Sequence, residues 1–338
     1  MFGYNAVEAA YPLHAYKQAT EVLAVLYLAL TLSNIPAGLL AGMKSTKALI
    51  IFGPVGYFIF VYCLLGNNFL LALVSSIILG FTSAIYGICL RAIIFKEVYE
   101  GGWGFAFGAV NVTGVLGGGL GPYVLLKFHY ESLLKFAAVL CLLSIVPLVL
   151  LYRVAQEESY EKSYEKLSLS SIKIDKNFAI YGVIAFCFAV HLAILIAYIP
   201  VIGKEVVGEY RLFAYAIPSV LSLFGGLLYD RVGAVVIPIF SFLGLISFLN
   251  LQSNIIAWGF ILTASFSVLS PGFQALMGRI VSKERIAVAL GFVGFLSGIG
   301  VSLNIAVIGN LLAQAKVYLA VLIALGCFLS LYLVRTVS

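Results

Sequence analysis

Gly225-Gly226-Leu227-Leu228-Tyr229-Asp230-Arg231-Val232-Gly233 stands at the end of an apolar run and gives the first evidence for the fold. Sliding the sequence on itself by 188 residues pairs its Gly226-Leu227-Leu228 with Gly38-Leu39-Leu40. The same offset also pairs Pro12 with Pro200, Glu21 with Glu209, and Arg91 with Arg279. One register held across several apolar runs predicts two related halves, because chance matches do not share an offset.

The chain as a whole is strongly apolar. Its 338 residues are 63% hydrophobic and 10% charged, with a mean hydropathy of +1.11, whereas soluble domains are about 45–50% apolar and about 25% charged. Apolar runs of about 18 residues or more recur throughout, and each can cross a bilayer as a helix. The runs lack the alternation of barrel strands, so we predict an all-α, polytopic membrane protein.

The apolar runs divide into two sets of six predicted helices. The spans are expected at 1–14, 20–41, 48–66, 69–95, 103–126, 132–152, 178–202, 210–229, 234–250, 254–281, 286–312 and 316–335. We therefore expect an N-terminal six-helix bundle over 1–152, a polar cytoplasmic linker over 153–177 and a C-terminal six-helix bundle over 178–338, related by a pseudo-two-fold axis. The 188-residue register places the counterpart of the start of helix 7 before Met1, so helix 1 is expected to be incomplete.

Charge sets the expected orientation. Fourteen Lys and Arg residues fall on one predicted side and six on the other, and such an excess marks the cytoplasm. The linker and the C-terminus are therefore expected in the cytoplasm and the protein in the plasma membrane. The sequence has no basic run with interleaved aromatic residues, so a nucleic-acid partner is not expected. The five cysteines lie in apolar segments without ligand spacing, so neither a metal nor a cofactor is expected.

Polar side chains inside the predicted helices are candidate solute-binding or coupling groups, because embedded polar groups usually face a cavity or another helix. They are Asn5, Glu8, Asn34, Tyr86, Asn111, His191, Tyr198, Gln274 and Asn304. Helices 3, 6, 9 and 12 carry no Asn, Gln, Glu or His in their interiors and are expected to face lipid. No Lys or Arg lies at the predicted midplane, which favours a neutral or cationic, partly apolar solute over an organic phosphate.

Two of these residues are candidates for proton coupling. Glu8 precedes Pro12 by four residues, and a carboxyl group removed from water can load and release a proton near neutral pH. His191 is the second candidate, because imidazole titrates near neutral pH without a large perturbation. For both residues, an interhelical hydrogen bond with no transport role remains an alternative.

The segment 225–233 resembles the Gly-x-Leu-x-Asp-Arg-x-Gly signature of the major facilitator superfamily, which occurs after helix 2 and, more weakly, after helix 8. The resemblance implies twelve helices and alternating access. It also implies a conformational latch formed by Gly226, Asp230, Arg231, Gly233 and Arg279. Gly226 permits close helix approach, and Asp230 can accept from a helix N-terminus or pair with Arg279. Alternatively, Arg279 only marks the cytoplasmic boundary of helix 10. In the first half, Gly42 stands in place of the acidic residue.

A second motif bears on the direction of transport. Gly117-Gly118-Gly119-Leu120-Gly121-Pro122 is similar to the Gly-x-x-x-Gly-Pro motif of the family's antiporters, and implies helix packing through Gly117, Gly121 and Pro122. The usual trailing glycine pair is absent. This departure weakens the preference for efflux, so proton-coupled efflux of lipophilic or cationic compounds by a monomer is favoured only slightly over uptake of a sugar or other metabolite. A non-transporting relative is a further alternative, and an intramembrane enzyme would need a catalytic signature that the sequence lacks.

Overall fold

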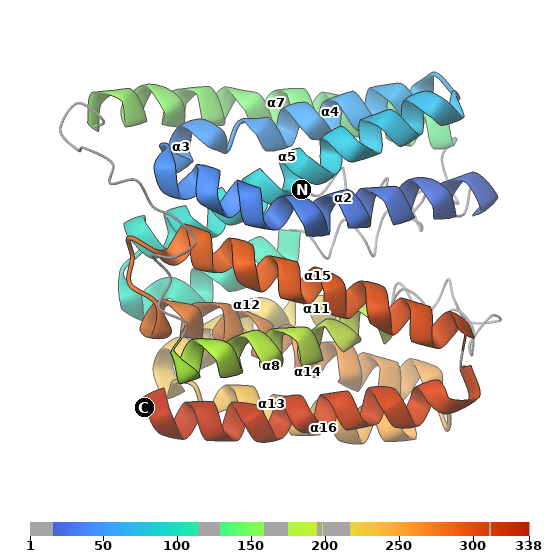
Figure 1. The fold of residues 1–338 in the computed structure, drawn as a ribbon, viewed down its shortest axis with the longest axis vertical. Helices are drawn as coiled ribbons and strands as arrows, with labels where there is room; N and C mark the ends of the chain where they lie inside the picture. Colours follow the sequence, from blue (N-terminus) through green and yellow to red (C-terminus); the bar gives the residue numbers. More distant parts are fainter. Residues whose placement is uncertain are drawn as a thin grey trace. The chain divides into compact units, whose positions relative to one another are not determined.

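Long apolar helices follow one another along the described chain (Figure 1). The computed structural model describes residues 16–113, 129–158, 175–194, 198, 217–310 and 312–337, and these residues form helices and turns but no strand. Among them, eight helices are long and apolar enough to cross a membrane. The expected all-α, polytopic architecture is confirmed.

The chain forms two compact units, and each contains segments from both halves of the sequence. The first unit comprises Met1–Glu97, Gly121–Lys173 and Ser282–Phe295, and the second comprises Val98–Leu120, Ile174–Val281 and Leu296–Ser338. The expected division at the 153–177 linker stays a prediction, although residues 153–158 continue a helix.

The described residues of the first unit form five helices and the beginning of a sixth. These are α2 (Tyr16–Met43), α3 (Thr46–Leu49), α4 (Phe52–Leu65), α5 (Phe69–Glu97), α7 (Tyr130–Glu158) and the first part of α15 (Ile286–Asn310).

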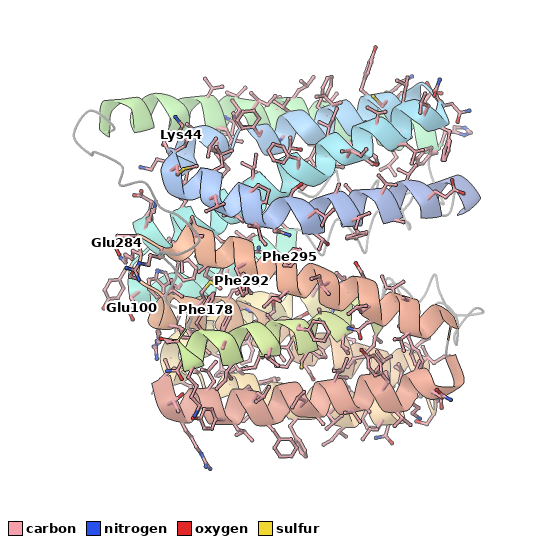
Figure 2. All side chains as sticks on the ribbon, viewed as in Figure 1. Lys44, Glu100, Phe178, Glu284, Phe292 and Phe295 are labelled. Atoms are coloured by element: carbon pink, nitrogen blue, oxygen red, sulfur yellow. The ribbon has the colours of Figure 1, made fainter. Side chains whose placement is uncertain are left out.

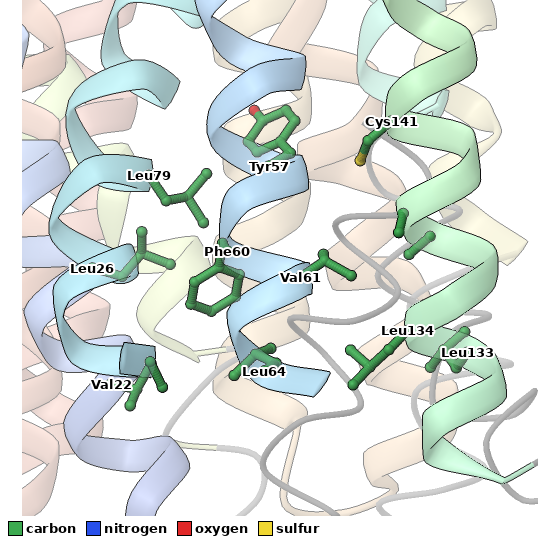
Figure 3. Close-up of a cluster of buried hydrophobic side chains, with 13 residues drawn as sticks. Val22, Leu26, Tyr57, Phe60, Val61, Leu64, Leu79, Leu133, Leu134 and Cys141 are labelled. Atoms are coloured by element: carbon green, nitrogen blue, oxygen red, sulfur yellow. The ribbon is translucent and has the colours of Figure 1, made fainter. Parts of the chain in front are cut away.

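Side chains from α2, α4, α5 and α7 meet in one apolar core (Figure 3). Leu26, Phe60, Leu79 and Leu134, one from each helix, are at most 2% exposed. Gly80 of α5 permits the close packing on α2, because a Cβ there would lie 2.7 Å from the Leu30 backbone nitrogen. Since lipid tails are as apolar as these side chains, close packing holds the helices together more than removal from water does.

The second unit contains the remaining helices. They are η1 (Glu100–Gly102), the helix of residues 103–113, here named the Gly104 helix, α8 (Lys176–Ala193), α11 (Ile217–Ser219), α12 (Leu221–Val232), α13 (Val236–Asn250), α14 (Ile255–Ile280), the rest of α15, and α16 (Leu312–Val337).

Within the second unit, α14 packs against α12 and α13, and α16 packs against α8 and α13. Two of these helices begin with a side-chain cap: Asp175 accepts from the Phe178 backbone N–H at 2.8 Å, and Asn254 accepts from the Ala257 N–H at 2.9 Å. α12 ends at Gly233, whose φ of 84° is a conformation that glycine adopts readily. These caps and the turn set where the apolar spans start and stop.

The outer helices present large apolar side chains. Leu143 of α7, Phe242 of α13 and Phe328 of α16 are 61%, 55% and 70% exposed. A water-soluble surface rarely carries so much contiguous apolar area. These helices include three of the four that the sequence analysis expects to face lipid.

Candidate functional site

The backbones of α12 and the Gly104 helix cross at very close range. Gly226 of α12 faces the carbonyl group of Gly104, and a Cβ on either glycine would overlap the backbone of the other helix. Gly225 faces Val268 of α14 in the same way. α12 therefore lies between two helices, and both contacts require glycine.

Asp230 joins the same two helices through hydrogen bonds. Its Oδ1 accepts from the backbone N–H of Gly104 at 2.8 Å, and its Oδ2 accepts from the N–H of Phe105 at 2.8 Å. The first N–H groups of a helix have no partner inside that helix, and the helix dipole adds positive potential there. Asp230 is thus an N-terminal cap supplied by a different helix.

The other expected latch residues lie around this cap. The guanidinium group of Arg279 lies over the Tyr229 ring, 5.7 Å from its centroid. Among the ion pairs of the described chain, none joins Arg279 to Asp230. The expected pairing is absent from these ion pairs, and both carboxylate oxygens of Asp230 accept from backbone amides instead. Arg231 is exposed, and Gly233 forms the turn after α12.

The first unit contains a similar crossing between α2 and α15. A Cβ on Gly38 would lie 2.9 Å from the Cα of Gly291, and a Cβ on Gly294 would lie 2.7 Å from the side-chain oxygen of Asn34. Asn34 donates to a backbone carbonyl of its own helix at 2.9 Å. Gly42 has no side chain, so the carboxylate cap of the second unit has no counterpart at this position.

Charged groups near this crossing have local partners. Lys47 Nζ lies 3.1 Å from Glu97 Oε1 and joins α3 to α5. Glu284, which precedes α15, accepts from its own backbone N–H and from the Ser282 side chain, and these hydrogen bonds lower the pKa of its carboxyl group. The side chains of Lys44 and Glu284 are both exposed (Figure 2). Lys47 and Glu284 thus have partners within the first unit.

Three uncharged polar side chains meet between the Gly104 helix and α14. Asn111 Nδ2 donates to Ser270 Oγ at 3.3 Å. Gln274 Nε2 donates to Asn111 Oδ1 at 3.3 Å and to Ser270 Oγ at 3.2 Å. All three side chains are only partly buried. Two predicted candidates, Asn111 and Gln274, are therefore brought together, and we name the three residues the amide cluster.

His191 and Asn304 place buried polar atoms in the second unit. The His191 ring stacks on Phe266 of α14, with centroids 4.0 Å apart, and its Nε2 is buried without a hydrogen-bond partner in the described part of the chain. Asn304 of α15 is fully buried, and neither of its side-chain polar atoms has a partner there. Such groups are costly unless a water, an ion or a solute satisfies them.

The two tyrosine candidates lie in packed surroundings. Tyr86 of α5 is partly buried and packs edge-on against Tyr57, with centroids 5.9 Å apart. Tyr198 is 2% exposed and belongs to the apolar core of the second unit, where its hydroxyl accepts from Gln252 at 3.3 Å. The contacts of Tyr198 are those of a core residue.

Five predicted residues lie outside the described part of the chain: Asn5, Glu8, Gly117, Gly121 and Pro122. Sequence reasoning missed three participants, namely Gly104, Phe105 and Ser270 as a partner of both amides. Only a cluster of glycines before residue 105 hinted at the first. The amide groups that Asp230 binds belong to the backbone, and a backbone group leaves no signature in the residue types.

This architecture defines a class: a multi-pass, all-helical membrane protein whose two units contain glycine-based crossings between helices of different sequence halves. The model of the Major Facilitator Superfamily matches residues 1–249, which is more than half of the chain. The chain belongs to this superfamily, and it is therefore a membrane transporter of small molecules rather than an enzyme.

Solved structures give the same fold. FucP, a Major Facilitator Superfamily transporter in the outward conformation, is 15% identical with a TM-score of 0.73, covering 98% of this chain and 96% of its own. A bacterial homologue of the iron transporter ferroportin is 14% identical with a TM-score of 0.68, covering 99% and 96%. The human organic anion transporter MFSD10 (TETRAN) is 12% identical with a TM-score of 0.76, covering 97% of each chain. No curated protein matches the chain.

Proposed function

We propose that this chain is a secondary transporter that carries a small solute by alternating access, and that Asp230 stabilises one of its two states. The observation that carries the proposal is the pair of 2.8 Å hydrogen bonds from Gly104 and Phe105 to Asp230. They join helices that come from different halves of the sequence, so their making and breaking can accompany the movement of one half against the other.

The strength of this contact suits a reversible latch. Hydrogen bonds to a charged group contribute about 1.5–3 kcal/mol each, and two conformations that interconvert differ by a few kcal/mol. The Gly226–Gly104 contact adds shape specificity, because only backbone without a Cβ fits there. Asp230 and the two glycines therefore favour the state in which α12 and the Gly104 helix are in contact, and this state can still open.

Proton coupling is part of the same proposal. His191 is an ionisable group in the interior of the second unit, and its stacking on Phe266 leaves Nε2 without a partner in the described chain. A proton gradient could act on this nitrogen or on Glu8. We further propose a monomer in the plasma membrane, with the polar linker and the C-terminus in the cytoplasm, on the basis of the Lys and Arg distribution.

For the direction of transport and the class of solute, two candidates remain: efflux of lipophilic or cationic compounds and uptake of a neutral metabolite. Efflux of lipophilic or cationic compounds depends on the Gly117–Pro122 motif, which lies outside the described residues. Uptake of a neutral metabolite is favoured by one described feature, the amide cluster, which offers donors and acceptors but no charge. The two candidates differ in the charge of the solute that the second unit must hold.

The latch is tested by comparing Asp230→Ala with Asp175→Ala. Asp175 also caps a helix at 2.8 Å, but within its own helix, so the pair separates a lost cap from a lost latch. We expect faster hydrogen–deuterium exchange in a peptide spanning residues 101–108, and altered solute-dependent proton flux in liposomes, for Asp230→Ala alone. Unchanged exchange and flux in Asp230→Ala would sink the proposal.

A further inference from the structure

The geometry points to Ser270 and Gln274 as ligands of a neutral, hydroxyl-bearing solute that takes the place of Asn111. In this inference, which rests on the proposed function, the solute competes with Asn111 for the same hydrogen bonds. Binding therefore releases the Gly104 helix from α14. The amide cluster acts both as a solute site and as a tie between two helices.

The hydrogen bonds of the cluster can be exchanged. They measure 3.2–3.3 Å, longer than the usual 2.9–3.0 Å for N–H donors. Ser270 Oγ accepts from both amides, so its own proton is still available for an acceptor. A solute hydroxyl both donates and accepts, so it can accept from Ser270 and Gln274 after displacing the Asn111 side chain.

The two segments that carry the amide cluster supply no charged side chain at it. Residues 103–113 contain no Asp, Glu, Lys or Arg, and α14 contains none before Arg279. A charged solute bound between two such segments would lose its hydration without gaining a counter-charge. The His191 ring on α8 stacks on Phe266, and the hydrogen bonds of the amide cluster do not involve it.

The neighbouring contacts make α14 the stationary partner. Tyr181 of α8 donates to the Phe273 carbonyl group at 2.8 Å, and the two rings stack with centroids 4.4 Å apart. Figure 1 shows α8 in front of α14, and the two helices are in contact. On its other side, α14 packs against Tyr229 at Gly272. Ser270 and Gln274 are therefore held in place from two helices.

The Gly104 helix contacts α12 and α14 in different ways. Its glycines pack on α12, and Asp230 of α12 accepts from its N-terminal amides. Asn111, which lies seven residues or about 10 Å further along the helix, hydrogen-bonds to α14. Loss of the Asn111 hydrogen bonds would remove a tie to α14 and keep the Asp230 hydrogen bonds to α12. Solute binding thus removes one of the contacts that hold the Gly104 helix against its neighbours.

The experiment compares substitutions at the two ends of one hydrogen bond. Asn111→Leu removes the competitor, whereas Gln274→Leu and Ser270→Ala remove the ligands. Asn250→Leu is the matched control, because Asn250 is exposed and donates to its own helix. Equilibrium binding to the purified chain is measured with D-glucose, D-mannitol and myo-inositol as neutral probes, tetraphenylphosphonium as a cation and benzoate as an anion.

We expect at least one neutral probe to bind. Asn111→Leu should lower its dissociation constant about threefold or more, and Gln274→Leu should raise it about threefold or more, as one net hydrogen bond implies. Ser270→Ala should act as Gln274→Leu does, and Asn250→Leu should have no effect.

Three results would overturn the inference. These are binding of no neutral probe, Gln274-dependent binding of the cation or the anion, and weaker binding in both Asn111→Leu and Gln274→Leu. Failure of the proposed function is distinguishable from these, because it would appear as absent flux in liposomes while the binding pattern of the variants persists.

Discussion

The carboxylate of Asp230 accepts the backbone N–H of Gly104 at 2.8 Å, across a separation of 126 residues in the sequence. This contact makes the α12 crossing different from the α2 crossing, where Gly38 meets Gly291 without an acidic residue at Gly42. In the described residues, the α12 crossing thus combines close packing with a carboxylate cap, whereas the α2 crossing has no acidic residue at the equivalent position.

Exchanging the charges of Asp230 and Arg279 should not restore what Asp230→Arg loses. An arginine at position 230 has no acceptor for the Gly104 and Phe105 amides, and an aspartate at position 279 lies over Tyr229 rather than beside those amides. The measurement is transport in liposomes for both single variants and the double variant. Recovery of activity in the double variant would show that the two side chains pair directly.

Gly226→Ala should destabilise the protein by about 1–3 kcal/mol, as overpacking against rigid atoms does. The new Cβ would meet the Gly104 backbone, which cannot move aside as a side chain can. Gly244→Ala is the control, because its Cβ would approach only the Phe266 ring, at 3.2 Å. Thermal unfolding in detergent checks this, and equal melting temperatures for the two variants would contradict it.

Asn304→Leu should raise the melting temperature while lowering transport. An unsatisfied buried polar group costs about 1–3 kcal/mol, and an apolar residue of similar size removes that cost. Asn304 is fully buried, with no partner for either polar atom in the described chain. If the melting temperature falls instead, Asn304 has a partner that stabilises the resting protein.

His191→Phe should abolish the pH dependence of transport and leave the fold intact. A phenyl ring can keep the stacking on Phe266, now at 4.0 Å between centroids, but cannot bind a proton. The comparison is solute flux with and without a pH gradient. Phe266→Leu, which removes the stack but keeps the imidazole, is the control and should lower stability without removing the response to pH. A normal pH response in His191→Phe would assign coupling elsewhere, with Glu8 as the next residue to replace.

Helix positions followed from hydropathy, because lipid admits a spanning helix only where a long apolar run satisfies its own backbone. The boundaries of α14 at Ile255–Ile280 lie within one residue of the expected 254–281 span. The end of α7 at Glu158 was not foreseen. Polar residues such as Gln156 do not end a helix unless a helix breaker follows them.

From the sequence alone came the membrane class and the family resemblance, since these depend on composition and on short spacings along the chain; the duplication and the latch stay predictions. Tertiary structure alone decided that Asp230 binds the amides of Gly104 and Phe105 and that Ser270 joins Asn111 to Gln274. Those partners lie more than 100 residues apart in three of the four contacts, and amide groups of the backbone are the same at every position. Only the path of the chain in space can select among them.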